Sequence, residues 1–574
     1  MKKFISVVLT VILVLSSVSV AAFAAEKDDL KIAVASDLHY NVPREELEGN
    51  PSQPIKIDHP IYWYANRRAA MEDESGFIID EFLRQCAEDD SIEYVLIPGD
   101  LADNGKIVIE EHYAVAEKLR AFEEATGKDV FVINGNHDAS LNDCDTKFEE
   151  FMEIYADFGW DKAIDTLDGT CSYTADLGDK YRLIALDSCH ASYSTEDGMT
   201  TAKVNWVCNM AKKAVNEGRH PILMMHHNLL DHLPMQRIIS RNFIIRNHTI
   251  TADQFANAGI KVVFSGHEHC SDGAVYISSQ GNKIYDFATT SLTMYPLQYR
   301  VFTFNDDRID YEARTVDSID LDALTSTVKG YSAEQLALME AGLNDYAKGF
   351  LKAGVEYRLA LGFTMEKMGI DEDAIYYDLV NSVVGKLVSA LETPLYGEGS
   401  ISEQMKKYGF SIPESEYENG WDLATDLVAA HYEGEEVYPL EGEAVTILLR
   451  TVAFILREEL SLLSGSTLTA SADAMIADNG LTAYKPQLTE MGSTAFGGGI
   501  SAAEYFVVAL LSPLLYTFAN DADGVPDNNG TLEGYGTVTS KSKLDNLAEK
   551  FRSFFETIAM YFRMFMDIIA KIGQ

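Results

Sequence analysis

Five short apolar runs in the first half of the sequence each end in a cluster of polar side chains. The run at 94–97 shows this most clearly, because Pro98-Gly99 stops it and Asp100 follows. A run of this kind predicts a buried strand that ends in a tight turn. Open α/β sheets bind their ligands beyond the carboxyl ends of the strands, so we expect Asp100 to lie at the binding end of its strand.

The other four clusters follow equally strand-like runs, and they occupy residues 36–39, 134–138, 225–228 and 265–269. Their side chains are carboxylates, imidazoles and an amide, which are ligand types that suit Zn, Fe and Mn. If the five strand ends meet at one edge of the fold, these groups surround a site for two metal ions. Asp100 is then the natural bridge between the ions.

We predict seven ligands for two divalent or trivalent ions of Mn, Fe or Zn type: Asp37, His39, Asp100, Asn136, His226, His267 and His269. One ion is assigned to Asp37, His39, Asp100 and His269, and the other to Asp100, Asn136, His226 and His267. His227 is the neighbour of His226, and the sequence does not decide which of the two is the ligand. Ions about 3.5–4 Å apart would clamp a phosphoryl group and lower the pKa of a bridging water.

His137 has no metal in this assignment, although it follows the ligand Asn136 directly. This position suits a general acid that protonates the leaving group, or a cation that stabilises the transition state. Asp103, three residues after the bridging carboxylate, is placed to accept the other ring proton of His137 and to orient the ring. We therefore predict His137 and Asp103 as the catalytic residues.

Strand-like and helical segments alternate through the first half of the chain, and antiparallel strands are predicted at 274–277, 283–287 and 300–304. This order predicts an α/β fold with a mixed sheet, or with two sheets packed face to face, and helices outside. Beyond about residue 316 helical periodicity dominates, as in 333–351, 445–463 and 502–518. Because 574 residues exceed a single core, we predict a catalytic domain at 25–316 and a helical domain at 317–574.

Residues 1–24 have the pattern of a signal peptide. Lys2 and Lys3 precede an apolar stretch at 4–20, and Ala22-Phe23-Ala24 fits the small-x-small cleavage pattern. No cysteine lies near the cleavage point, so a bacterial lipid anchor is not expected. The mature chain is therefore predicted to be secreted or extracytoplasmic.

The net charge of −43 argues against duplex nucleic acid as a partner, because neutralising phosphates needs Lys and Arg. We expect a small-molecule or surface-linked substrate instead. The segment 521–530 has closely spaced oxygen ligands, but it lacks the full calcium-loop spacing and is interpreted as a polar loop. The last predicted helix, 543–572, is expected to dock on its own domain, with membrane-surface contact as a second interpretation.

Together the five clusters resemble the motifs of the calcineurin-like metallophosphoesterase superfamily. The D-x-H, G-D-x-x-D, G-N-H-D, strand-H and G-H-x-H motifs stand at Asp37, Asp100, Asn136, His226 and His267. The resemblance covers about residues 30–315 and leaves the C-terminal half without a family. It implies a β-sandwich flanked by helices, a binuclear metal centre, and direct attack by metal-bound hydroxide without a covalent phospho-enzyme.

The implied function is an exported phosphoesterase that hydrolyses phosphomonoester or phosphodiester bonds. Asp103-Asn104-Gly105 departs from the Arg-Gly of protein Ser/Thr phosphatases and from the Tyr ligand of purple acid phosphatases. The remaining pattern is similar to a broad bacterial group that includes cyclic-nucleotide phosphodiesterase-like enzymes. A nuclease of the same superfamily is one alternative, and a non-catalytic surface-binding protein on this fold is another. The latter would predict lost ligands or a lost acid, whereas every motif and His137 are present.

Overall fold

The computed structural model describes residues 29–43, 69–142, 144–192, 194–233, 236, 241–305, 308–362, 386, 389–434, 439–440, 442–478, 481–518 and 525–534. The predicted signal peptide and the predicted helix at 543–572 lie outside these residues. None of the helices in the described part of the chain combines the length and the apolar character needed to cross a membrane.

The first sheet has six strands in the order β13-β12-β11-β1-β2-β3. Their bounds are β1 (Leu30–Val34), β2 (Tyr94–Ile97), β3 (Asp129–Val132), β11 (Gln298–Phe304), β12 (Arg308–Thr315) and β13 (Asn529–Glu533). β1, β2 and β3 run parallel, and β11, β12 and β13 add antiparallel pairings. The three parallel strands are the predicted apolar runs, and they are almost wholly buried. Their carboxyl ends therefore lie together at one edge of the sheet.

The second sheet has seven strands in the order β4-β5-β6-β7-β8-β10-β9. Their bounds are β4 (Asp165–Thr166), β5 (Tyr173–Leu177), β6 (Tyr181–Leu186), β7 (His220–Met225), β8 (Val262–His269), β9 (Asp272–Ile277) and β10 (Lys283–Thr290). β6, β7, β8 and β10 are parallel, and β5 and β9 are antiparallel to their neighbours. β5 and β6 form an antiparallel pair.

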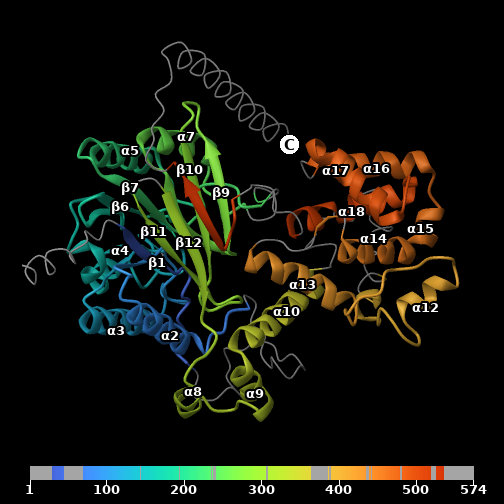
Figure 1. Cartoon of the computed structure of the whole chain (residues 1–574), viewed down its shortest axis with the longest axis horizontal. Coiled ribbons are helices and arrows are strands. Elements are labelled where there is room, and N and C mark those ends of the chain that lie inside the picture. Colours follow the sequence, from blue (N-terminus) through green and yellow to red (C-terminus); the bar gives the residue numbers. More distant parts are fainter. Residues whose placement is uncertain are drawn as a thin grey trace, which may run out of the picture.

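The two sheets pack face to face through a shared aromatic core. Phe302 of β11 contacts Phe264 of β8 and Phe287 of β10, with ring centroids 4.6 Å and 5.0 Å apart. Helices cover the outside of the sandwich (Figure 1). They are α2 (Ser75–Glu88), α3 (Ile109–Thr126), α4 (Phe148–Ile154), α5 (Thr201–Asn216) and α7 (His248–Ala258). The predicted α/β sandwich with flanking helices is confirmed.

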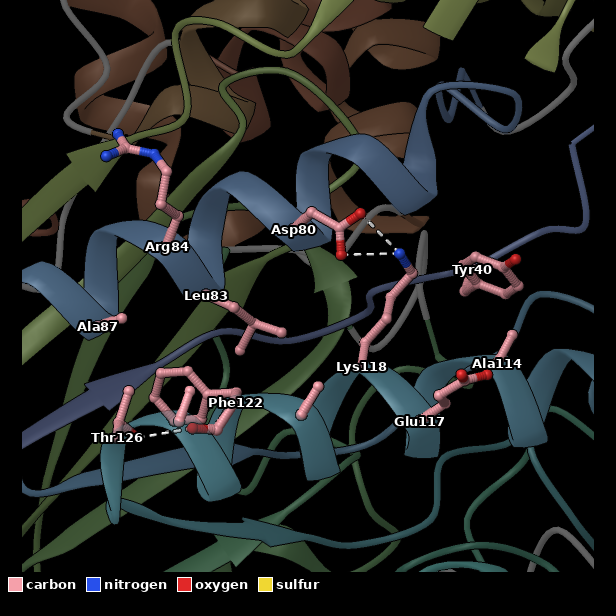
Figure 2. Close-up of a pocket in the computed structure, with 12 residues that line it drawn as sticks. Tyr40, Asp80, Leu83, Arg84, Ala87, Ala114, Glu117, Lys118, Phe122 and Thr126 are labelled. Carbon is pink, nitrogen blue, oxygen red and sulfur yellow. Dashed lines mark hydrogen bonds and ion pairs between the residues drawn. The ribbon is translucent and has the colours of Figure 1, made fainter. Parts of the chain in front are cut away.

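A surface groove runs between α2 and α3 (Figure 2). Its walls carry small and apolar side chains such as Ala87 and Phe122, and an ion pair crosses it from Lys118 Nζ to Asp80 Oδ2 at 2.7 Å. Tyr40 lines one end of the groove. The predicted ligands and catalytic residues do not line it, so the groove is separate from the predicted site.

The C-terminal region is mostly helical. Its described helices are α8 (Leu321–Thr327), α9 (Ala333–Ala341), α10 (Leu343–Gly362), α12 (Ile401–Lys406), α13 (Gly420–Glu433), α14 (Glu443–Ile455), α15 (Arg457–Ser461), α16 (Gly465–Asp478), α17 (Lys485–Phe496) and α18 (Ala502–Phe518). α14, α17 and α18 share a core of their own, which includes Val445, Leu488 and Val508. α10 and α13 instead contribute Phe350 and Val428 to the core of the sandwich.

The domain boundary near residue 316 stays a prediction, and two observations bear on how the regions connect. β13 comes from the far side of that boundary, and it pairs with β12 in a register that places Gly530 opposite Tyr311. The predicted helix at 333–351 is two helices, α9 and α10, with Gly342 between them. The chain therefore leaves the sandwich after β12 and returns to its edge at β13.

Candidate metal centre

The ends of five parallel strands deliver the predicted site residues to one place. Asp37 and His39 follow β1, Asp100 follows β2, Asn136 and His137 follow β3, His226 follows β7, and His267 and His269 end β8. Five of these residues have a left-handed backbone: Asp37, His39, Asp100, His267 and His269. Positive φ is uncommon outside glycine and gathers at functional sites. It turns the backbone at the ends of β1, β2 and β8, which lets His267 and His269 both reach the cluster.

One group of candidate ligands consists of Asp37, His39 and His269. His39 Nε2 lies 3.1 Å from His269 Nε2, and His269 Nε2 lies 3.2 Å from Asp37 Oδ1. His39 Nε2 is also 3.8 Å from Asp100 Oδ2. The four residues assigned to the first ion are therefore brought together.

A second group consists of Asp100, His226 and His267. Asp100 Oδ2 lies 3.2 Å from His226 Nε2, which in turn lies 2.9 Å from Asn136 Oδ1. The His226 and His267 rings are 4.7 Å apart. Asp100 thus contacts both groups, as the predicted bridging position requires.

The positions of these side-chain atoms are suited to bound metal ions. Among the described residues, His267 Nε2 is buried without a hydrogen-bond partner. Asp37 Oδ1 and Asp100 Oδ2 are also buried, and the nearest polar atoms to them are histidine nitrogens of the same cluster. Buried polar atoms in that state are costly, so they need a partner. A cation that binds N and O atoms at about 2.1 Å holds its ligands roughly 3.0–3.4 Å apart, which is the spacing seen for several pairs here.

The charges around the two groups also suit a cation. Burial raises the pKa of the Asp37 carboxyl, but His269 and His226 outweigh burial and lower it. Burial likewise opposes ionisation of Asp100, yet His226 and His137 hold its pKa well below the usual range. Burial lowers the pKa of His267 well below its usual range, with help from His227 and His226. Two carboxylates and a neutral imidazole are therefore available for coordination.

His137 forms a third candidate ligand group with His39 and Asp100, and it is partly exposed. Its Nδ1 is 2.7 Å from the backbone carbonyl oxygen of Asp103, and its backbone N–H donates to Asp100 Oδ1 at 2.8 Å. The Asp103 carboxylate points elsewhere, with Oδ1 3.1 Å from His39 Nδ1. Asp103 thus contacts the His137 ring through its main chain, and its side chain orients a candidate metal ligand.

The structure decides between the two neighbouring histidines that follow β7. His226 faces Asp100, whereas His227 Nδ1 lies 2.9 Å from Ser188 Oγ and its Nε2 lies 3.3 Å from the Thr195 carbonyl oxygen. His232 is buried between two carboxylates, 2.6 Å from Asp272 and 3.2 Å from Asp286. Neither His227 nor His232 joins the ligand groups found among the described residues.

Sequence reasoning missed several residues that support the ligands. Ser36 Oγ donates to Asp37 Oδ2 at 2.5 Å, Phe243 stacks on the His267 ring with centroids 4.4 Å apart, and Met294 Sδ lies 3.1 Å from His269 Nδ1. Ser36 adjoins a motif and offered a signal. Phe243 and Met294 are remote in sequence from the histidines they touch, so no local pattern marks them.

All of the predicted site residues lie inside residues 30–271, and this range matches the family model for calcineurin-like phosphoesterases. Residues 30–271, referred to below as the phosphoesterase domain, are therefore similar to the calcineurin-like phosphoesterases. No curated protein matches the chain significantly. The remainder of the chain lies beyond the range of the family match.

Solved structures similar to about half of this chain include a dimetal phosphatase from Danio rerio, with 12% identity, a TM-score of 0.37, and coverage of 50% of this chain and 96% of that chain. GAP50, the anchor in the inner membrane complex of Plasmodium, shares 10% identity with a TM-score of 0.31, over 50% of this chain and 85% of that chain. A predicted phosphoesterase from Streptococcus pneumoniae shares 11% identity with a TM-score of 0.21, over 50% of this chain and 90% of that chain.

Proposed function

We propose that this protein is an exported phosphoesterase that uses two divalent or trivalent metal ions of Mn, Fe or Zn type to hydrolyse a phosphomonoester or phosphodiester. The convergence of buried carboxylate and imidazole ligand atoms around Asp37, Asp100 and His267 carries this proposal. Asp37, His39, Asp100 and His269 would hold one ion, and Asp100, Asn136, His226 and His267 the other. When bound, such ions polarise the phosphoryl group and activate water at neutral pH.

The residues of the chain supply the remaining functions. His137 is held by the Asp103 carbonyl through Nδ1, which fixes its tautomer when Nδ1 carries the proton. Its other ring nitrogen is then the atom that exchanges a proton with the leaving oxygen. His137 is partly exposed while Asp37 and Asp100 are fully buried, so it lies on the solvent side, where a leaving group departs.

The proposed substrate is a small or surface-linked phosphoester. The large negative charge of the chain disfavours a nuclease role on duplex nucleic acid, and the signal-peptide pattern of residues 1–24 supports export. Every predicted ligand and His137 are present at the site, which disfavours a role limited to surface binding.

The test is hydrolysis of bis-p-nitrophenyl phosphate and p-nitrophenyl phosphate by the full chain, with added Mn²⁺, Zn²⁺ or Fe²⁺ and with a chelator. We expect turnover that the chelator abolishes, and the ratio of the two rates assigns diester or monoester preference. The Asp100→Asn variant is the control for contaminating phosphatase. A chain that binds no metal and shows no turnover would overturn the proposal.

A further inference from the structure

The turn that follows His269 joins β8 to β9 and is unusually constrained. Cys270, Ser271 and Asp272 are all buried. The Arg300 guanidinium, itself buried, donates to Ser271 Oγ at 2.7 Å and to the Asp272 carbonyl oxygen at 3.3 Å. The Asp272 carboxylate pairs with His232 at 2.6 Å. Arg300 of β11 and His232 thus hold this turn from two sides.

Two segments of the C-terminal region hold the same turn from the other sides. The Ser271 N–H donates to the Tyr432 carbonyl oxygen at 3.1 Å, and Ser271 Oγ donates to Asn528 Oδ1 at 3.0 Å. The Gly273 N–H donates to Asp527 Oδ1 at 2.9 Å. Both segments lie far beyond residue 271, where the family match ends.

The two C-terminal segments also contact each other, and their fit against the turn is close. Asn528 Nδ2 donates to the Glu433 carbonyl oxygen at 2.9 Å. A Cβ placed on Gly434 would lie 2.4 Å from the Ser271 carbonyl oxygen and 2.9 Å from Asp527 Cβ. The turn therefore has almost no room to shift while these segments are in place.

A second route connects the C-terminal region with the His269 ring. Tyr295 Oη donates to Glu433 Oε2 at 2.6 Å. The preceding residue, Met294, places its Sδ 3.1 Å from His269 Nδ1. Groups beyond residue 430 thus hold both the backbone that follows His269 and Tyr295, the neighbour of the residue that touches the His269 ring.

We propose that Asp527, Asn528 and the end of α13 are positioning residues for His269, so that the C-terminal region completes the metal centre of the phosphoesterase domain. This inference rests on the proposed two-ion centre and adds residues from outside the family match to it. Partners that orient a metal ligand commonly change metal affinity 10- to 100-fold when they are removed. A purely structural role would lower stability and leave metal affinity unchanged.

The experiment compares Co²⁺ binding to the full chain and to variants, followed by visible absorption and equilibrium dialysis. We expect Asp527→Ala to lower the affinity for one of the two bound ions by about 10- to 100-fold. Asp527→Asn keeps an oxygen acceptor for the Gly273 N–H and should restore most of the affinity. Asn528→Ala removes the contacts with Ser271 and Glu433 at a less buried position, and it tests the inference if Asp527→Ala does not fold.

The matched control is Thr531→Ala, which removes an exposed hydrogen bond from β13 to Asp310 Oδ1 at 2.7 Å without touching the turn. It should bind both ions as the unaltered chain does. In the metal-free protein, faster amide hydrogen exchange at 269–273 in Asp527→Ala, but not in Thr531→Ala, would support the same conclusion.

Unchanged affinity for both ions in Asp527→Ala and Asn528→Ala, with only a lower unfolding temperature, would overturn the inference. If those variants bind and hydrolyse normally, the inference fails and the proposed function stands. If the unaltered chain binds no Co²⁺, the two-ion centre is wrong and the inference falls with it.

Discussion

Metal uptake at this centre should require the loss of a proton from His226. Burial lowers the pKa of His226, but Asp100, 3.2 Å from its Nε2, outweighs burial and raises that pKa to about 9. In the metal-free protein the ring is therefore an imidazolium at neutral pH. Its Nε2 is the atom that faces Asp100 and Asn136, so a bound ion must replace the proton there.

The size of the effect follows from the pKa. At pH 7 the ring is about two units below its pKa, so roughly 99% of it is protonated, and the apparent metal affinity is about 100-fold, or about 3 kcal/mol, below its high-pH limit. Because the folded pKa is raised above the ordinary value, the proton stabilises the metal-free fold below pH 6.5. That contribution is lost as the pH rises through about 9. Affinity should therefore increase about tenfold per pH unit between pH 7 and 9.

Calorimetric titration with Mn²⁺ at pH 7.5, in two buffers of different ionisation enthalpy, measures the protons released on binding. We expect His226 to contribute about one proton. His227→Gln is the matched control: burial, with a smaller contribution from His226, lowers the pKa of His227 to about 3, so this ring carries no proton to release. Affinity that stays constant from pH 7 to 9, with no proton release, would refute the reasoning.

Three further substitutions separate the roles at the site. Asp100→Asn keeps an acceptor for the His137 N–H, so near-ultraviolet circular dichroism should be unchanged. Turnover should fall by about 10³-fold or more, because a bridging charge is lost. Near-normal turnover would exclude the two-ion mechanism. His137→Ala should lose about 10²- to 10⁴-fold in turnover and keep both ions in equilibrium dialysis, and lost metal would instead make His137 a ligand. Asp103→Ala should weaken metal binding about 10- to 100-fold, because its carboxylate orients His39; the pH dependence of turnover should be unchanged, since the carbonyl that holds His137 remains.

The strands and the ligands were predictable because both are encoded locally. Each ligand follows an apolar run within a few residues, as Asp100 follows β2, so the order of strands places the ligands at a shared edge. The pairing of β13 with β12 was not predictable, because the 529–533 segment carries no apolar alternation and its partner strand is more than 200 residues earlier. Its single buried side chain is Leu532.

The directions of the side chains at the site could also not be predicted from the sequence. Asp103 offers both a carbonyl and a carboxylate, and only the path of the backbone shows that the first contacts His137 and the second contacts His39. The choice between His226 and His227 depends on the path of the backbone after β7 ends at Met225. No local pattern distinguishes these alternatives.

The position of β13 has a consequence for the order in which the chain can fold. During synthesis or transport from the N-terminus, β12 emerges long before the strand that pairs with its free side. That edge stays unpaired while the helical region is synthesised. Unpaired strand edges favour misassembly and aggregation. The helical region is therefore a long insertion between two neighbouring strands, and β12 gains its second strand partner only late in the synthesis of the chain.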